Sequence, residues 1–573
     1  MPPARLGDYL RDLRALFDSY GYQSSLYGHF GQGCVHCRIN FDVRTEEGIK
    51  KWRRFLDDAA DLVARYGGSL SGEHGDGQAR AALLPKMYGE EIVQAFREFK
   101  AIWDPRDRMN PGKIVNPYPI TSNLRLGGSY RVAEPLQTHF AYPEDDGRFS
   151  RAVLRCVGVG KCRRWSGGVM CPSFMVTHDE KDTTRGRARA LFEMIHGGPI
   201  EQGWRSEHVK ETLDLCLACK GCKRDCPVNV DMATYKAEFM AHYYKGRLRP
   251  RSAYSMGLIY WWSRLASTMP GLVNFALKAP GLSPALKAAG GIARERRFPA
   301  YAKPTFRQWF ERRGPRHGNG RRVILFPDTF NNYFQPRVGA AAVEVLEAAG
   351  YQVQIPPRTL CCARPLYAEG MLGRAKSLLR QIIETLGPMI EDGTAVVGLE
   401  PACVATFKDE LINLFPDDAR ARRLAEQSYT LSEFLAAEGV ALPPLHRNAV
   451  VHFHCNHHAV LEPAAEKKVL RDMELDFGVL DSGCCGMAGS FGFEQEHYDI
   501  SIKCGERVLL PAVREAARDT LIISDGFSCR EQIAQTTERQ ALHLAQVMQM
   551  ALREGPNGAP GDPPERDYLR LRA

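Results

Sequence analysis

The chain has 573 residues and a net charge of +9. This length is too great for one hydrophobic core and indicates about three or four domains. The charge is small for the length, and no Lys/Arg run is interleaved with aromatic residues, which excludes nucleic acid as a favoured partner. The N-terminus lacks the apolar core of a secretory signal, and the longest apolar stretch, residues 253–263, is shorter than the ~20 residues of a membrane-spanning helix.

The 17 cysteines are an odd number, and most of them lie in tight groups close to Gly and Pro. This distribution suits metal ligation better than a disulfide framework and implies a reducing compartment. We therefore expect a cytoplasmic protein, and peripheral contact with the inner face of a membrane stays open.

Residues 1–119 form the first predicted domain. Apolar residues at helical intervals indicate a first helix: Leu6, Leu10, Leu13 and Phe17. A Gly-rich turn then enters a strand within 27–42, and a second helix runs from about residue 46 to 65. Residues 120–150 are polar and interrupted by Gly and Pro, as expected of a linker.

Two short segments of this domain carry groups that bind divalent metals. One Gly-rich turn contains His29 and His36, and the second contains Glu73 and His74. Two imidazoles and a carboxylate leave open positions on a metal. Strand alternation places His36 and Arg38 on one face, so a metal-bound oxygen and a carboxylate-binding guanidinium share a pocket that suits a 2-hydroxy acid. Either segment alone is more often structural, but their combination favours a metal site.

Residues 151–240 contain an iron–sulfur motif. Cys216, Cys219, Cys222 and Cys226, followed by Pro227, have the spacing C-x-x-C-x-x-C-x-x-x-C-P of a cubane cluster. A zinc site is the alternative, but zinc sites seldom have four thiolates at this spacing before a Pro.

The pairing rule of two-cluster ferredoxins gives Cys171, which precedes Pro172, as the fourth ligand of Cys216, Cys219 and Cys222. The second site has only three thiolates, because Val159 stands in the fourth position. It holds a three-iron cluster, a four-iron cluster with an outside ligand, or nothing. Its three thiolates are Cys156, Cys162 and Cys226.

Residues 241–315 are a basic, aromatic connection interrupted by Pro. Arginines cluster around Leu248. They favour a solvated helix face over contact with anionic lipid.

The remaining sequence repeats one unit, in residues 320–440 and 445–555: strand, helix, Cys-Cys pair, strand, Cys. Strands that alternate with helices predict two small α/β lobes with parallel sheets and cysteines at the strand ends.

The repeat resembles the cysteine-rich CCG modules of heterodisulfide reductase and of iron–sulfur subunits that oxidise glycolate, lactate and glycerol 3-phosphate. The second copy has a full thiolate set for a cluster: Cys455, Cys484, Cys485 and Cys529. The first copy has Asn331 and Asn332 near the place of Cys455, so we expect it to be degenerate. It retains Cys361, Cys362 and Cys403. His454, His457 and His458 either support the cluster ligands or begin a solvated helix.

Residues 21–118 resemble the C-terminal half of the flavin-dependent D-2-hydroxy-acid dehydrogenases, which carry a G-H-x-G-D-G-N-x-H turn and an E-H-G segment. The resemblance implies that His29, His36 and Glu73 bind a divalent metal such as zinc or manganese. It also implies that His74 is the base that removes the hydroxyl proton.

The segment Met109–Lys113 resembles the family segment that closes against the flavin. This likeness implies that Asn110, Gly112 and Lys113 contribute to cofactor binding. The flavin-binding domain of the family precedes this region, so we expect an N-terminally incomplete chain or one subunit of a split enzyme.

The order of domains resembles the C-terminal part of the large bacterial FAD and iron–sulfur D-2-hydroxyglutarate dehydrogenases, which are similar to D-lactate dehydrogenases. It implies a multidomain α+β and α/β fold: an α+β FAD-linked oxidase C-terminal domain, an α-helical ferredoxin-like domain and duplicated α/β CCG lobes. Electrons would pass from a D-2-hydroxy acid through FAD and 4Fe-4S clusters to a quinone or an electron-transfer protein. The alternatives are a non-catalytic electron-transfer subunit of a glycolate- or lactate-oxidising complex and a heterodisulfide-reductase-like chain.

Overall fold

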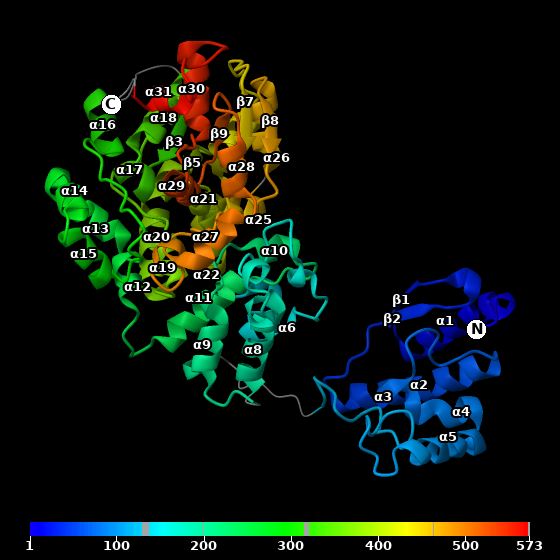
Figure 1. Ribbon diagram of the computed structural model, residues 1–573. Coiled ribbons are helices and arrows are strands. Elements are labelled where there is room, and N and C mark those ends of the chain that lie inside the picture. The colour runs from blue at the N-terminus through cyan, green and yellow to red at the C-terminus, as the bar shows by residue number, and fades with distance from the viewer. Residues whose placement is uncertain (129–136, 197–198, 315–319, 462, 571–573) are drawn as a thin grey trace. The chain divides into compact units, whose positions relative to one another are not determined.

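The structure is a computed structural model that describes residues 1–128, 137–196, 199–314, 320–461 and 463–570 (Figure 1). The chain divides into two compact units, residues 1–132 and 133–573, which we call unit 1 and unit 2 and describe separately. Residues 129–136 of the predicted linker lie outside the described residues.

Unit 1 combines helices with one two-stranded antiparallel sheet, as the α+β prediction requires. Its main elements are α1 (Leu6–Tyr20), β1 (Ser24–Tyr27), β2 (His36–Ile39), α2 (Glu46–Arg65), α3 (Gly77–Arg80), α4 (Leu84–Tyr88) and α5 (Glu90–Trp103). The Thr45 side chain accepts a hydrogen bond from the backbone of Gly48 and so begins α2 where the sequence predicts it. Phe17 of α1 stacks on Phe55 of α2 in the core beneath the sheet.

The first part of unit 2 is helical in its described residues, which confirms the prediction of an α-helical ferredoxin-like region. Its helices are α6 (Phe149–Leu154), α7 (Phe174–Thr177), α8 (Thr184–His196), α9 (Glu207–Asp214), α10 (Gly221–Asp225) and α11 (Met232–Tyr243).

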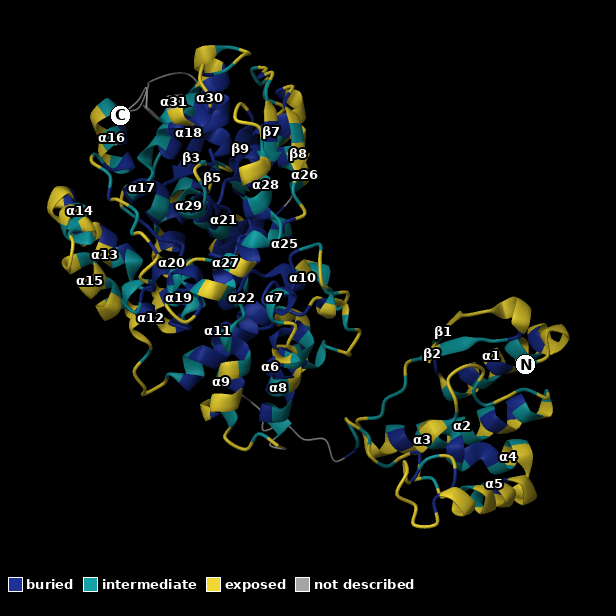
Figure 2. Ribbon diagram, viewed as in Figure 1, coloured by how far each residue is buried: buried dark blue, intermediate teal, exposed yellow. Residues whose placement is uncertain are grey.

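Five helices follow in the connection: α12 (Arg251–Ser255), α13 (Ile259–Ala266), α14 (Pro270–Lys278), α15 (Leu282–Gly290) and α16 (Phe306–Arg313). α13, α14 and α15 lie together on the surface of unit 2 and carry many exposed residues (Figure 2). α16 is different, because Phe306 and Phe310 are buried in the core of the lobes.

Lobe 1 contains a parallel four-stranded sheet in the order β4-β3-β5-β6. Its strands are β3 (Arg322–Phe326), β4 (Gln352–Gln354), β5 (Ala395–Gly398) and β6 (Ser428–Thr430). The surrounding helices are α17 (Thr329–Tyr333), α18 (Pro336–Ala348), α19 (Arg364–Ala368), α20 (Leu372–Leu386), α21 (Pro401–Lys408), α22 (Glu410–Leu414), α23 (Ala419–Glu426) and α24 (Leu431–Ala437).

Lobe 2 repeats this arrangement with a parallel sheet in the order β8-β7-β9. Its strands are β7 (Asn448–Val451), β8 (Asp476–Val479) and β9 (Leu521–Ile523). Its helices are α25 (Cys455–Val460), α26 (Pro463–Asp472), α27 (Tyr498–Glu506), α28 (Leu509–Glu515), α29 (Phe527–Thr536), α30 (Leu544–Glu554) and α31 (Pro564–Arg570). A parallel bridge between Ile523 and Leu542 stands where β6 pairs with β5 in lobe 1.

The two lobes share one hydrophobic core, which runs from Val323 and Leu325 of β3 to Val451 of β7 and Ile523 of β9. The buried residues of Figure 2 are concentrated around these two sheets. The predicted duplicated α/β lobes with parallel sheets are therefore confirmed.

Lobe 2 also packs against the ferredoxin-like helices. His497 Nε2 lies 3.1 Å from Asp214 Oδ2, and its Nδ1 lies 2.9 Å from Glu494 Oε2. Burial lowers the pKa of His497, but the two carboxylates outweigh burial and raise it to about 9. The protonated imidazole therefore ties α9 to lobe 2.

We expect His497→Gln to destabilise unit 2 in a pH-dependent way. The folded-state pKa lies above the ordinary value of 6.5. The stabilisation is therefore fully present below about pH 6.5 and is lost as the pH rises through about 9. Thermal unfolding should give a lower melting temperature for His497→Gln than for the wild-type protein at acidic pH. This difference in melting temperature should disappear at the alkaline end of the pH range. His446→Gln, at an exposed His–Glu pair, is the control. A constant difference at every pH would contradict the assignment.

Candidate metal and iron–sulfur sites

Glu73 lies at the centre of the predicted metal site in unit 1. Its Oε1 lies 3.2 Å from His29 Nδ1 and 3.3 Å from His36 Nε2, and its Oε2 lies 3.0 Å from His74 Nε2. The structure thus brings together the three imidazoles and the carboxylate that the sequence singled out. Cys34, which the sequence reasoning did not include, lies 3.3 Å from Glu73 Oε1.

Close packing of two turns positions these groups. A side chain on Gly72 would approach Cys34 Sγ to 2.7 Å, and one on Gly28 would approach the Cys34 carbonyl to 2.6 Å. Tyr27 of β1 pairs with His36 of β2 across the sheet, and their rings stack with centroids 4.8 Å apart. The imidazole of His36 is thereby held toward Glu73.

The charge of this site fits a cation. Hydrogen bonds from Cys34 and then from the imidazoles lower the pKa of Glu73 to about 2, so the carboxylate is ionised. Ligand atoms of His36, Glu73 and His74 all lie within 4.8 Å of one another. Glu73 and His36 are partly exposed, while His29 is mostly exposed. The donor set fits a divalent metal with open positions.

Arg38 lies two residues beyond His36 on β2. Its guanidinium lies 5.6 Å from the centre of the Tyr27 ring, and its Nε donates to Tyr27 Oη at 3.4 Å. Arg38 and His36 therefore both contact Tyr27, which is consistent with the prediction that they share one face of the strand.

The segment with Asn110, Gly112 and Lys113 folds back toward α3. Lys113 Nζ donates to Gln78 Oε1 at 2.7 Å. Asn110 and Gly112 both have positive φ, and a side chain on Gly112 would collide with the ring of Tyr118. The segment is therefore a tight turn that presents backbone groups.

In the ferredoxin-like region, Cys171 lies in a loop that is fixed to α10. Asp225 of α10 accepts hydrogen bonds from the backbone of Val169 at 2.9 Å and Met170 at 3.1 Å. A side chain on Gly221 would meet Val169 at 2.7 Å. Cys171 has a left-handed backbone (φ 59°), and its Sγ accepts a hydrogen bond from the backbone of Thr184 at 3.0 Å.

Cys171 lies between the two predicted clusters. Contact with Cys171 lowers the pKa of Cys162 to about 6, and Cys222 is among the charges that act on Cys171. The backbone of Met232 donates to Cys222 Sγ at 3.4 Å. Burial raises the pKa of Cys222 to about 12, with further effects of Cys216 and Cys226. Val159, which stands at the fourth position of the second site, is 63% exposed, and its side chain has no donor atom.

Lobe 2 gathers its four predicted cysteines in one buried cluster. Cys484 contacts Cys455 and Cys485, and Cys485 contacts Cys529. The contact with Cys484 lowers the pKa of Cys485 well below its usual value, whereas contact with Cys485 and burial raise that of Cys529. Four adjacent thiolates repel one another in a buried site, and an iron core supplies the charge that holds them together. The residues fit an iron–sulfur cluster.

His452 is a fifth group at this cluster that sequence reasoning missed. One of its ring nitrogens lies within 4.8 Å of Cys485 Sγ and Cys529 Sγ. Its Nδ1 is 2.7 Å from Ser482 Oγ, and its contact with Cys485 helps to lower the pKa of that thiol. Its position directly after β7 was the available signal, since side chains at the carboxyl ends of parallel strands converge.

Of the three histidines that flank Cys455, two are buried. Burial lowers the pKa of His454 to about 3, so the ring is neutral. Its Nδ1 accepts a hydrogen bond from the backbone of Asn456 at 3.2 Å and caps α25. His457 is buried beside Glu466, and His458 Nε2 lies 3.3 Å from Asp225. A solvated helix start therefore does not describe this segment.

Lobe 1 repeats the contacts of lobe 2 with three thiols. Cys361 contacts Cys362, and Cys362 Sγ lies 2.7 Å from Cys403 Sγ. Cys403 and Cys529 are each the third residue of a helix, α21 and α29. Thr329 is the first residue of α17, as Cys455 is of α25, and its side chain contacts Cys361. Thr329 of lobe 1 therefore corresponds in position to Cys455 of lobe 2. The sequence had indicated Asn331, two residues further along the chain.

One buried cluster of side chains connects the ferredoxin-like region with lobe 2. It contains Cys219 together with Cys455 and Cys484. Burial raises the pKa of Cys219 well above its usual value, and a charge on Cys455 would raise it further. The two predicted iron–sulfur sites are therefore adjacent within unit 2.

The cysteine sites fit an iron–sulfur protein, and the carboxylate and imidazoles of unit 1 form a separate group whose donor set fits a divalent cation. Three family models match in the same order along the chain: FAD linked oxidases, C-terminal domain, at residues 1–114; 4Fe-4S dicluster domain at residues 152–230; and Cysteine-rich domain at residues 328–408. The last of these lies in lobe 1.

The chain is 25% identical to the D-2-hydroxyglutarate dehydrogenases of Pantoea ananatis (strain AJ13355) and Escherichia coli (strain K12), over 96% of its own length. It spans 57% and 58% of the length of these two relatives. Lactate utilization protein A of Bacillus subtilis (strain 168) is 30% identical over 40% of this chain and 98% of that protein.

The chain belongs to the same family as lactate utilization protein A over the region that the two share, and its residues 1–114 match the C-terminal domain of FAD linked oxidases. The predicted resemblance is thus confirmed, and 4Fe-4S clusters and FAD are the cofactors that the matched domains support.

We expect Cys485→Ser to remove one cluster from the anaerobically purified chain. Serine keeps the shape of the side chain but replaces the low-pKa thiol that contacts Cys484 and Cys529. Iron content should fall, and the electron paramagnetic resonance signal of that cluster should disappear. Cys504→Ser is the matched control, because Cys504 is equally buried and its Sγ faces the Pro172 carbonyl at 3.6 Å. Equal iron loss in both variants would contradict the assignment.

We expect Thr329→Cys to complete the thiol set of lobe 1 and to increase the iron content of the chain. The new thiol would stand beside Cys361, as Cys455 stands beside Cys484. Asn331→Cys, the position indicated by the sequence, should add no iron, because the Asn331 side chain is turned to Asp328 at 2.7 Å. Iron analysis of the two variants decides between the positions.

Proposed function

We propose that the chain is the part of an FAD- and iron–sulfur-dependent dehydrogenase that oxidises a D-2-hydroxy acid of the D-2-hydroxyglutarate or D-lactate type. The convergence of His29, His36 and His74 on Glu73 carries this proposal, because it supplies ligands and a base in one place. The relatives that cover 96% of the chain are named D-2-hydroxyglutarate dehydrogenases, which supports this substrate class.

His29, His36 and Glu73 would hold a divalent ion, zinc or manganese, which would lower the pKa of the substrate hydroxyl. Arg38, on the same face of β2 as His36, would bind the substrate carboxylate through its guanidinium. Glu73 Oε2 holds His74 by Nε2, which leaves Nδ1 to take the hydroxyl proton. His74 is therefore the proposed base of the reaction.

FAD, when bound, accepts the hydride that leaves C2 of the hydroxy acid. The turn with Asn110, Gly112 and Lys113 would lie against this cofactor and would offer it backbone groups and one ammonium. The rest of the flavin site would belong to an upstream FAD-binding domain or subunit.

Within unit 2, electrons would pass from the cluster of Cys171, Cys216, Cys219 and Cys222 toward that of lobe 2. The shared buried environment of Cys219 and Cys455 supports this order. A quinone or an electron-transfer protein would be the acceptor.

A non-catalytic electron-transfer subunit is the second candidate. Lactate utilization protein A aligns with only 40% of the chain, whereas the D-2-hydroxyglutarate dehydrogenases align with 96% of it. A subunit that only transfers electrons would not need the group of histidines around Glu73 in unit 1. The presence of this group therefore favours the dehydrogenase.

We expect Glu73→Gln to weaken zinc or manganese binding to the chain by about 100-fold or more, because it removes the ionised ligand. Isothermal titration of the chain freed of divalent metal measures this, and an unchanged circular dichroism spectrum shows that the fold of unit 1 persists. In the holoenzyme, the variant should lose turnover of the hydroxy acid. Glu91→Gln, at an exposed carboxylate of α5, is the control. Wild-type metal affinity and turnover in Glu73→Gln would refute the proposal.

A further inference from the structure

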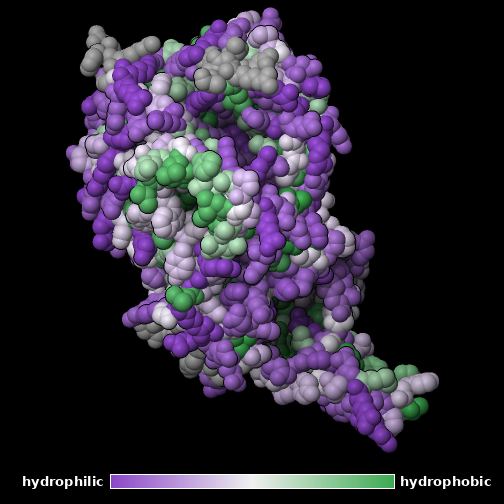
Figure 3. Space-filling view, turned by 60° about the vertical axis from the view of Figure 1, so that its left-hand side comes forward, coloured by the Kyte–Doolittle hydropathy of each residue, from purple (hydrophilic) through white to green (hydrophobic). Residues whose placement is uncertain are grey.

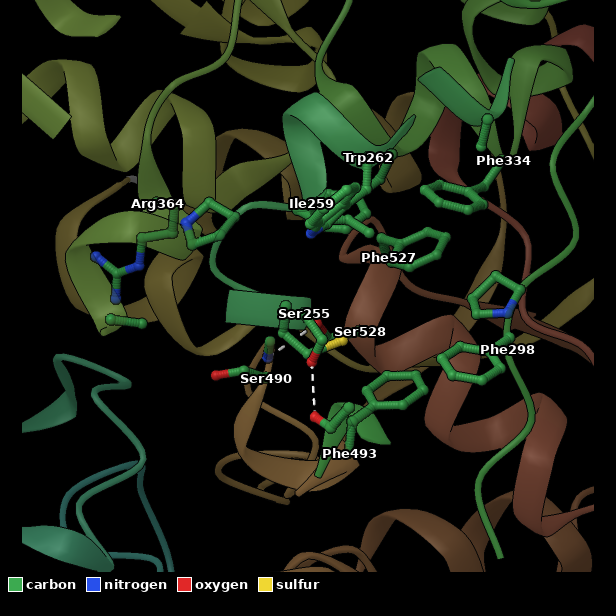
Figure 4. A pocket seen from close by; sticks show the side chains of 18 of the residues that line it. Ser255, Ile259, Trp262, Phe298, Phe334, Arg364, Ser490, Phe493, Phe527 and Ser528 are labelled. Carbon is green, nitrogen blue, oxygen red and sulfur yellow. Dashed lines mark hydrogen bonds between the residues drawn. The ribbon is translucent and has the colours of Figure 1, made fainter. Parts of the chain in front are cut away.

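A large apolar cavity lies where the connection helices meet the two lobes. Its volume is about 1010 Å³, which is large enough for an extended small molecule. Its walls come from α13, α14 and α15 on one side and from both lobes on the other, and Leu217–Cys219 of the ferredoxin-like region also lines it (Figure 4). All of these segments belong to unit 2.

Aromatic rings form one wall of the cavity. Phe330 and Phe527 stack with centroids 4.7 Å apart, and Phe334 lies 5.9 Å from Phe527. Trp262 and Phe493 extend this lining, and their rings are seen around the same space in Figure 4. Such a wall accepts a flat ring by stacking.

Thiols from the ferredoxin-like region and from both lobes reach the same cavity. Cys219, Cys403 and Cys455 are among its lining residues. Arg364 and His454 also line the cavity, so polar and sulfur-bearing side chains are present in a lining that is otherwise mainly apolar. A ligand with a polar redox-active head and an apolar tail matches this mixed lining.

The connection helices carry exposed apolar side chains, three of which also line the cavity: Leu265, Met269 and Leu272. Leu265, Met269, Leu272 and Phe275 are 58–68% exposed. Figure 3 shows hydrophobic residues gathered around a hollow on one face. Among the described helices of the chain, none has both the length and the apolar content to cross a bilayer. An apolar surface of this kind suits shallow contact with lipid.

The charge of this region complements an anionic lipid surface. Residues 245–294 contain eight Lys and Arg residues and no Asp or Glu. Arg251 and Arg264 are exposed on α12 and α13, beside the apolar side chains. The sequence favoured a solvated helix face here, but the exposed Leu and Phe residues of α13 and α14 favour lipid contact.

We propose that this cavity binds a lipophilic quinone, which enters from an anionic lipid surface through the face of α13–α15. The inference rests on the proposed function and identifies the quinone as the electron acceptor of the proposed dehydrogenase. Oxidation of the hydroxyl to a keto group releases two electrons and two protons. Reduction of the quinone to the quinol consumes two electrons and two protons, and the protons exchange with water, so the overall reaction balances.

The test measures binding of decylubiquinone to the iron-loaded chain in mild detergent, by equilibrium dialysis. Ala276→Trp places a large ring in the cavity, and Ala285→Trp adds the same ring at an exposed position of α15 outside the lining. We expect Ala276→Trp to weaken binding by about tenfold or more and Ala285→Trp to leave it unchanged. Equal binding by both variants, or none by the wild-type chain, would overturn the proposal.

Sedimentation with vesicles tests the entry face. The chain should bind phosphatidylglycerol-containing vesicles more strongly than pure phosphatidylcholine vesicles, and Leu272→Glu with Phe275→Glu should abolish this binding. A dimer that forms through this face and is lost in the same variant would show that a second copy covers it and would refute lipid entry.

Hydroxy-acid oxidation by the holoenzyme with a soluble dye as acceptor separates this inference from the proposed function. Ala276→Trp should keep the dye-linked rate and lose the quinone-linked rate. Loss of both rates would show damage beyond the cavity and would contradict the inference. A wild-type holoenzyme with quinone binding but no dye-linked rate would refute the proposed function alone.

Discussion

The arrangement of unit 2 depends on the burial of several thiols at the carboxyl ends of parallel strands. In lobe 2, Cys455 and Cys529 lie in the first turns of the helices that follow β7 and β9, and the Cys484–Cys485 pair follows β8. Parallel strands end at one edge, so the chain converges there at three points. Buried thiolates at such short separations are unfavourable without a positive iron core, which couples the fold of the lobe to its cluster.

The duplication explains why lobe 1 persists with only three thiols. Its sheet shares a core with lobe 2, and Glu400 Oε2 accepts a hydrogen bond from the backbone of Phe527 at 2.8 Å, at the start of α29. Burial raises the pKa of Glu400 to about 8, and His454 Nε2 lies 4.0 Å from its Oε1. Lobe 1 therefore caps the first turn of α29 in lobe 2. Lobe 1 supports the cysteine site of lobe 2 in this way whether or not lobe 1 itself binds iron.

Local patterns in the sequence were sufficient where spacing decides the structure. The cysteines from Cys216 to Cys226 and the start of α2 after Thr45 are of this kind. Contacts between distant segments were not predictable from spacing, and the approach of Cys34 to Glu73 and of His452 to Cys485 are examples. The place of Thr329 was missed for a different reason. The number of residues between a strand and the next helix decides which residue of lobe 1 corresponds to Cys455. The sequence repeat alone does not show where that helix begins.

The position of the cavity decides which acceptor the architecture favours. Cys219 and Cys455 both line it, so a ligand there is adjacent to the ferredoxin-like site and to lobe 2 at the same time. Its walls are mainly apolar, with a few polar side chains such as Arg364 and His454, so a neutral ring with an apolar tail loses less hydration free energy on entry than a charged molecule does. These features of the cavity support the proposal of a small, neutral, lipophilic acceptor.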